Sequence, residues 1–152
     1  MTSAQSGPER IDEQRLHAWT QLLEGHTRVM HELERELRDA HGLSLSEYDV
    51  LHRLQDADEH CLRMSELARA LLYSTGGLTR LIDRMEKRAL VERRTFSEDR
   101  RVTRVSITPE GEQSLRRASG THLRGLQRHF GHLLHDDELP AVGAFLGRFA
   151  KG

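Results

Sequence analysis

One change of hydrophobic period in the middle of the chain constrains the fold more than any other feature. Through most of the sequence, apolar residues recur at three- and four-residue steps, which is typical of amphipathic helices. Between residues 91 and 107 this spacing gives way to two short runs rich in β-branched residues, 91–96 and 102–107, separated by the polar segment 97–101. Two such runs around a polar turn predict a β-hairpin. We therefore expect a mainly α-helical chain with a small β-hairpin inserted.

The helices at the two ends of the chain are predicted to be long. Residues 9–40 carry an apolar face and end at Gly42, so this helix needs a surface to lie against, and a partner subunit is the natural candidate. Thr108 and Pro109 are an N-cap and a first helical position, and they predict a fifth helix that runs to about residue 134. Residues 136–138 open a last helix that we expect to bury its apolar face.

Three short helices are predicted between these long ones. Ser44 and Glu47 form a capping box that begins the second helix. A third helix is expected to begin near Ser65 as its N-cap, and after a break of turn and capping residues at 73–77 a fourth follows to about residue 89. Three short helices followed at once by a basic hairpin are the order of a winged helix–turn–helix.

The charge is unevenly distributed along the chain. The formal net charge is −1, but residues 1–73 sum to −6, residues 74–104 to +4 and residues 105–152 to +1. A positive block between acidic and neutral flanks is typical of a segment that meets a polyanion. A solvated charged face is the alternative interpretation, and charge alone does not exclude it.

Composition excludes several classes of protein. With 152 residues the chain is long enough for one domain, and no apolar run reaches the roughly 18–20 residues that a membrane span needs. The start of the sequence lacks a signal-peptide pattern. The single cysteine excludes an internal disulfide framework and a four-cysteine zinc site. We expect a cytoplasmic protein.

The predicted fourth helix and hairpin carry residue types that suit DNA. Small residues at the start of the helix allow the backbone to approach closely, Arg80 can reach a guanine edge, and Arg100 and Arg101 at the hairpin tip suit a narrow minor groove. We interpret Arg84, Arg93 and Arg94 as phosphate-contacting or surface residues. The predicted DNA-binding residues are Ser65, Ser74, Thr75, Gly76, Gly77, Thr79, Arg80, Arg84, Arg94, Asp99, Arg100 and Arg101.

The same residues carry a family resemblance. Residues 99–108, DRRVTRVSIT, resemble the wing signature D-x-R-x-x-x-V-x-L-T of MarR-type regulators, with Ile107 in place of Leu. Residues 67–68 and 78–86 are similar to the third and recognition helices of that family. Residues 87–91 match its usual K-R-G-L-V, with Ala89 at the glycine position. The match is close over about residues 44–111, and the order and spacing of its fragments make it specific.

The resemblance implies a winged helix–turn–helix lobe at 44–108 and dimerisation helices at 1–43 and 109–152. It implies a homodimeric bacterial transcription factor, usually a repressor, that binds pseudopalindromic double-stranded DNA through residues 75–89 and 91–107. It also places Asp99 as the residue that orients Arg101. Family members often bind a small aromatic effector between the dimerisation helices and the DNA-binding lobe. The candidate pocket residues here are His17, Trp19, His26, Asp49 and His52.

Several alternatives remain open. A regulator of the same fold that senses zinc would use histidines near the end of the fifth helix (His122, His129, His132, His135), although these drift around the helix and do not converge as zinc ligands must. Cys61, next to His60, is a candidate oxidant sensor. A helical interaction protein without DNA binding is a further alternative. We expect no metal, no cofactor and no enzymatic activity, because the sequence has no glycine-rich phosphate loop, H-E-x-x-H pair or nucleophile elbow.

Overall fold

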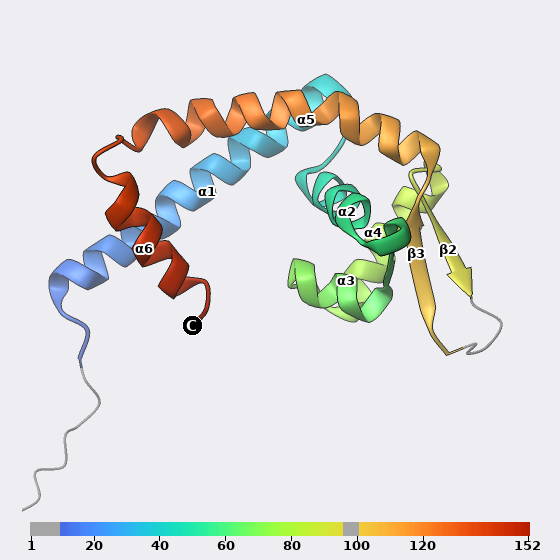
Figure 1. Cartoon of the computed structure of the whole chain (residues 1–152), viewed down its shortest axis with the longest axis horizontal. Helices are drawn as coiled ribbons and strands as arrows, with labels where there is room; N and C mark the ends of the chain where they lie inside the picture. Colours follow the sequence, from blue (N-terminus) through green and yellow to red (C-terminus); the bar gives the residue numbers. More distant parts are fainter. Residues whose placement is uncertain (1–9, 96–100) are drawn as a thin grey trace, which may run out of the picture.

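The computed structural model describes residues 10–95 and 101–152, which form an arch (Figure 1). One side of the arch is an arm of three helices, α1 (Glu13–His41), α5 (Pro109–His129) and α6 (Leu139–Phe149). The other side is a lobe that contains α2 (Leu45–Asp56), α3 (Met64–Leu71), α4 (Thr75–Lys87) and a small sheet. The winged helix–turn–helix arrangement that the sequence predicts is therefore confirmed.

The sheet has three strands, one more than the sequence predicts. β2 (Val91–Thr95) and β3 (Thr103–Ile107) form the expected antiparallel hairpin. β1 (Cys61–Arg63) pairs antiparallel with the other side of β3, which gives the order β1-β3-β2. The prediction of a hairpin alone was incomplete, because three residues are too few to show an alternating pattern. A 3-10 helix, Asp58–His60, leads into β1.

Side-chain caps define where most of these helices begin. Ser44 Oγ accepts a hydrogen bond from Glu47 N at 3.0 Å, while Glu47 Oε2 accepts one from Ser44 N at 2.9 Å, so the predicted capping box is confirmed. Thr108 Oγ1 accepts from Gly111 N at 3.0 Å and confirms the start of α5. These contacts satisfy backbone N–H groups that a helix leaves unpaired.

Two predicted helix boundaries were wrong. α3 begins at Met64, one residue before the expected cap Ser65, and the carboxylate of Glu66 accepts from Arg63 N at 2.9 Å instead. α5 ends at His129 rather than near residue 134, and a 3-10 helix, Gly131–Leu133, follows it. The chain turns there, so α6 folds back and crosses α1 in the view of Figure 1, where Phe149 contacts Trp19.

The hydrophobic core lies in the lobe and under the junction with the arm. Each fully buried leucine-sized side chain contributes roughly 1.5–3 kcal/mol of burial free energy. The buried cluster draws on α2, α3, α4, β2 and β3 of the lobe and on α1 and α5 of the arm. It includes Leu37, Leu51, Leu54, Leu67, Leu78, Leu81, Ile82, Met85, Val91, Val105 and Leu115.

A glycine lets the two long helices of the arm come close together. A Cβ at Gly125 of α5 would lie 2.7 Å from Leu33 Cδ2 and 2.6 Å from Glu36 Oε2, both on α1. The same carboxylate group of Glu36 accepts hydrogen bonds from Arg128 at 2.6 Å and from His129 at 2.8 Å. The close packing at Gly125 and the hydrogen bonds to Glu36 therefore fix the point at which α1 and α5 cross.

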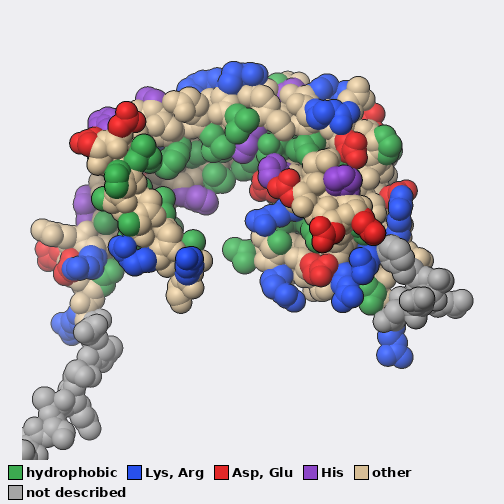
Figure 2. All heavy atoms as spheres, viewed as in Figure 1, with side chains coloured by type: hydrophobic (Ala, Val, Ile, Leu, Met, Phe, Trp, Pro, Cys, Tyr) green, Lys and Arg blue, Asp and Glu red, His purple; other side chains and the backbone are tan. Residues whose placement is uncertain are grey.

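Large apolar side chains remain uncovered along the rest of the arm. Trp19 and Leu16 of α1 are 44% and 50% exposed, and Phe145 and Phe149 of α6 are 48% and 53% exposed. Figure 2 shows hydrophobic side chains gathered along the underside of the arch. The apolar face of α6, which we expected to be buried, is therefore not buried within one chain. No helix in the described ranges is long and apolar enough to cross a membrane.

Candidate nucleic-acid interface

The N-terminus of α4 is open to solvent and carries no acidic residue. Ser74 Oγ caps the helix by accepting from Gly77 N at 3.1 Å, and the first turn that follows contains Thr75 and Gly76, both exposed. Thr79 Oγ1 donates to Thr75 O at 2.9 Å. The uncompensated N–H groups and dipole at such a helix end favour an anion such as phosphate.

Two arginines continue this surface along α4. Arg80 and Arg84 are exposed, and within residues 10–95 and 101–152 no acidic side chain pairs with either. If this face were only a solvated helix surface, Asp83 would be expected to pair with Arg80. Asp83 instead accepts a hydrogen bond of 2.6 Å from Arg93. The two guanidinium groups therefore keep their hydrogen-bond donors available.

A groove of about 490 Å³ joins α4 to the start of α3 and to the wing strands β2 and β3. Four of the predicted DNA-binding residues line it: Ser65, Thr75, Thr79 and Arg101. They come from three separate stretches of sequence, so the fold brings them together. Figure 2 shows basic side chains, interleaved with acidic ones, along the lower edge of the lobe.

Arg93 connects the wing to α4. From β2 its guanidinium donates to Asp83 at 2.6 Å and to Glu86 at 2.7 Å, and its backbone N donates to Glu86 Oε1 at 3.1 Å. Arg93 is therefore a structural link and not simply a phosphate-contacting or surface residue. Arg94, the next residue, is exposed and pairs with Glu92 on the same strand.

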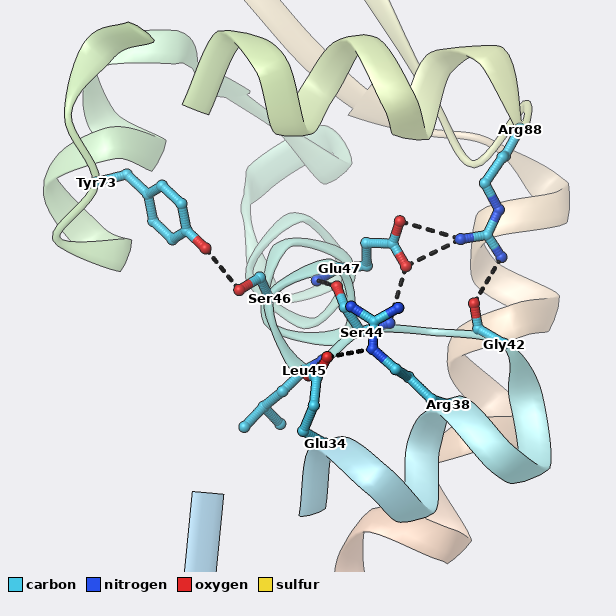
Figure 3. A network of polar contacts seen from close by, with 9 residues as sticks. All are labelled: Glu34, Arg38, Gly42, Ser44, Leu45, Ser46, Glu47, Tyr73 and Arg88. Atoms are coloured by element: carbon cyan, nitrogen blue, oxygen red, sulfur yellow. Dashed lines mark hydrogen bonds and ion pairs between the residues drawn. The ribbon is translucent and has the colours of Figure 1, made fainter. Parts of the chain in front are cut away.

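Two adjacent residues of α2 contact the chain at both ends of α4 (Figure 3). The hydroxyl of Tyr73, just before α4, lies 2.6 Å from Ser46 Oγ. At the other end, Arg88 Nη1 donates to both carboxylate oxygens of Glu47, at 2.9 and 3.0 Å. These contacts were not predicted, because the paired residues lie 27 and 41 positions apart and leave no local pattern.

The same network reaches the arm. Arg88 Nη2 donates to the carbonyl oxygen of Gly42 at 3.0 Å, at the end of α1. Glu34 of α1 accepts from Leu45 N at 2.5 Å and pairs with Arg38 (Figure 3). The first turn of α2 is thus bonded to α1 and to both ends of α4, which sets the orientation of α4 relative to the arm. The predicted residues Asp99 and Arg100 lie outside the described residues.

Comparison with known proteins identifies this architecture. A sequence model described as the MarR family matches residues 41–102. The crystal structure of AbsC, a MarR family transcriptional regulator from Streptomyces coelicolor, is 30% identical, with a TM-score of 0.85 over 95% of this chain and 97% of AbsC. The chain belongs to the MarR family. The structure of Sco3205 from the same organism, solved in complex with DNA, shares the fold at 24% identity and a TM-score of 0.88, covering 97% of this chain and 92% of that one.

Relatives known by sequence are also regulators. The HTH-type transcriptional regulator PrsX of Escherichia coli is 35% identical over 103 residues, or 68% of this chain. The aligned part of this MarR-family chain spans 62% of the length of PrsX. PrsX, AbsC and Sco3205 are all named as transcriptional regulators and not as enzymes.

A cavity of about 900 Å³ lies between α2, α3 and α5 of this MarR-family chain. Asp49 and His52, two of the predicted pocket residues, line it. The other three, His17, Trp19 and His26, lie exposed on the N-terminal half of α1, where Trp19 contacts Phe149 with ring centroids 6.4 Å apart. Within one chain the five residues therefore do not share a pocket.

Two titratable groups in this cavity have perturbed pKa values. Desolvation raises the pKa of Asp49, although the charges of Arg53 and His52 act in the opposite direction. Burial, and then the charge of His52, lower the pKa of His122. The His122 ring packs against Tyr48 at an interplanar angle of 32°, with centroids 4.4 Å apart, and its buried Nδ1 has no partner among the described residues.

The histidines of the zinc alternative and Cys61 of the oxidant alternative each contact neighbouring residues of the fold. Among the described residues, no group of three or more histidine, cysteine and acidic side chains is arranged to hold a metal ion. His129 contacts Glu36, and His132 Nδ1 lies 3.3 Å from Gln127 O. Cys61 is half-buried on β1, opposite Ser106 of β3.

Proposed function

We propose that this chain is a sequence-specific DNA-binding transcriptional regulator, and specifically a repressor. The observation that carries the proposal is the groove in which Ser65, Thr75, Thr79 and Arg101 meet beside the capped N-terminus of α4. In a helix–turn–helix protein the second helix enters the major groove with its N-terminal residues toward the bases. Here α4 would be that helix, and Arg101 would reach the adjacent minor groove from the wing.

The functional unit is proposed to be a homodimer, with dimerisation segments at 1–43 and 109–152 and a DNA-binding lobe at 44–108. The support is the apolar surface on the arm, where Leu16, Trp19, Phe145 and Phe149 are each about half exposed. Such a surface is uncommon on a monomer and is typical of a subunit interface. Two lobes related by a two-fold axis would read half-sites about one DNA turn apart, roughly 34–36 Å.

Control by a small ligand is part of the proposal. The cavity between α2, α3 and α5 adjoins Leu71 and Leu72, at the end of α3 and just ahead of α4. A ligand there would contact the segment that leads into the recognition helix, so binding could change the position of that helix and release DNA. Oxidant control through Cys61 stays a separate prediction, tested by whether peroxide weakens DNA binding in the wild type and not in Cys61→Ser.

Fluorescence anisotropy with the DNA upstream of the gene, and with a scrambled duplex of the same composition, tests the proposal. We expect preference for the upstream DNA and a steep fall of affinity with salt, because phosphate contacts release counterions. Arg101→Ala should weaken binding by about tenfold or more, whereas Arg116→Ala, an exposed arginine of α5, should not. Equal binding of both duplexes would show that the proposal is wrong.

A further inference from the structure

The cavity between α2, α3 and α5 has a wall that suits the apolar part of a ligand. Five leucines line it: Leu62, Leu71, Leu72, Leu123 and Leu126. Two of them are left largely uncovered, since Leu72 is 92% exposed and Leu123 is 63% exposed. The volume of about 900 Å³ lies within the range of sites that bury a drug-sized molecule.

The charges around this cavity are mostly negative. Among the described lining residues, three carry carboxylates (Asp49, Asp56 and Glu66), and Arg53 alone has a permanent positive charge. Two of the carboxylates already have contacts within the chain. Asp56 lies 3.3 Å from His52, and Glu66 accepts a hydrogen bond of 2.9 Å from Arg63 N.

Asp49 is the carboxylate that remains for a ligand. It accepts no hydrogen bond from the described residues, and Arg53 and His52 act on it only through their charge. Its carboxyl group is exposed at the cavity wall, yet the surrounding protein desolvates it enough to raise its pKa. A positively charged ligand group placed beside it would stabilise the ionised carboxylate and so offset that desolvation cost.

His122 adds no compensating positive charge. Its ring packs at a tilt against Tyr48, and burial together with the nearby His52 lowers its pKa below the ordinary 6.5, which favours the neutral imidazole at pH 7. A ligand carboxylate would therefore meet three carboxylates, the guanidinium of Arg53 and the imidazole of His52, which already lies against Asp56. Repulsion between like charges at close range therefore disfavours binding of an anionic ligand in this cavity.

We infer that this cavity binds an amphiphilic amine, with its ammonium group beside Asp49 and its apolar body against the leucines. The inference rests on the proposed function only in treating this ligand as the effector that controls DNA binding.

Three naphthalene derivatives of nearly equal size test the inference by calorimetry on the full chain without DNA: 2-naphthylmethylamine, the neutral 2-naphthylmethanol and 2-naphthoic acid. We expect the amine to bind at least about fivefold more tightly than the alcohol, as one partly exposed charge pair allows, and the acid to bind most weakly. Asp49→Asn should remove the advantage of the amine over the alcohol. The matched variant Asp39→Asn, on the exposed face of α1 away from the cavity, should leave that advantage unchanged.

Binding of the acid as tightly as the amine, or binding of none of the three, would overturn the inference. An advantage of the amine that survives Asp49→Asn would also overturn it. Because no DNA is present, these results are independent of the proposed function, which fails only if the upstream duplex is not recognised in the separate anisotropy experiment.

Discussion

Arg88, directly after α4, donates from one guanidinium nitrogen, Nη1, to both carboxylate oxygens of Glu47 at the start of α2, with distances of 2.9 and 3.0 Å. The side chain of Glu47 is only 8% exposed, so its charge depends on Arg88 and on the backbone N of Ser44 for compensation. The second nitrogen, Nη2, donates to Gly42 O at 3.0 Å, so the guanidinium serves two partners at fixed positions, which the single ammonium group of lysine cannot reproduce. The pair fixes one end of α4 to the rest of the molecule.

Arg88→Ala should therefore lower the free energy of unfolding by about 2 kcal/mol, because it leaves a buried carboxylate without its charged partner. Arg88→Lys should recover only part of this loss. Urea denaturation gives both values, and a double-mutant cycle with Glu47→Gln isolates the pair. Additive effects of the two changes would contradict the coupling that we describe.

Ala89 follows Arg88 and has a φ of +56°, in the left-handed region. A residue with a Cβ is strained there, while glycine is not. Ala89→Gly is expected to raise the free energy of unfolding by about 0.5–1 kcal/mol. Ala40→Gly, on the exposed helical surface of α1, should lower it by up to about 1 kcal/mol. Equal losses at the two positions would be inconsistent with strain at Ala89.

Gly125 permits the close approach of α5 to α1. An alanine Cβ there would lie 2.7 Å from Leu33 Cδ2, so Gly125→Ala should cost about 1–3 kcal/mol through overpacking. Gly25 in α1 has no atom within 4 Å of its Cβ position, and Gly25→Ala should add up to about 1 kcal/mol from helix propensity. Thermal unfolding of the two variants should show opposite signs, and a neutral Gly125→Ala would argue against the packing.

His122 should make stability depend on pH. Its folded-state pKa lies below the ordinary 6.5, so the unfolded chain takes up a proton that the folded chain does not. Stability from this group is complete above about pH 6.5 and falls as the pH drops below that value. His122→Phe should flatten the decrease of the melting temperature between pH 7.5 and 5.5. The exposed residue His31 supplies the control, His31→Phe, and an identical slope in His122→Phe would refute the assignment.

Local sequence signals were sufficient for much of the fold. Thr108 followed by Pro109 marked the start of α5, and the β-branched runs on either side of the polar segment 97–101 marked the wing strands. The same signals wrongly predicted Ser65 as the N-cap of α3. The helix begins one residue earlier, where Arg63 N donates to Glu66, and that start depends on where the chain leaves β1. Caps and turns were predictable wherever the partners lie within a few residues of one another.

Contacts between distant segments were not predictable from a single sequence. β1 forms because residues 61–63 pair with β3, where Cys61 lies opposite Ser106. Arg93 links the wing to α4 because the fold places it beside Asp83.

Among the groove residues, Ser65 and Thr75 were predicted from the starts of helices, and Arg101 from the hairpin tip and the family's wing signature. The fold brings them to one surface with Thr79. The ligand-pocket residues on α1 were chosen because the resembled family binds effectors beside its dimerisation helices, and that choice gives no information about how two chains meet.

Hydroxyl-radical footprinting of the protein on its own upstream DNA tests the central claim most directly. Two lobes acting together predict two protected stretches of DNA backbone about one turn apart, with flanking minor-groove protection that is lost in Arg101→Ala. A single protected patch, or protection that does not depend on Arg101, would contradict the account of a symmetric dimer that reads a duplex with α4 and the wing.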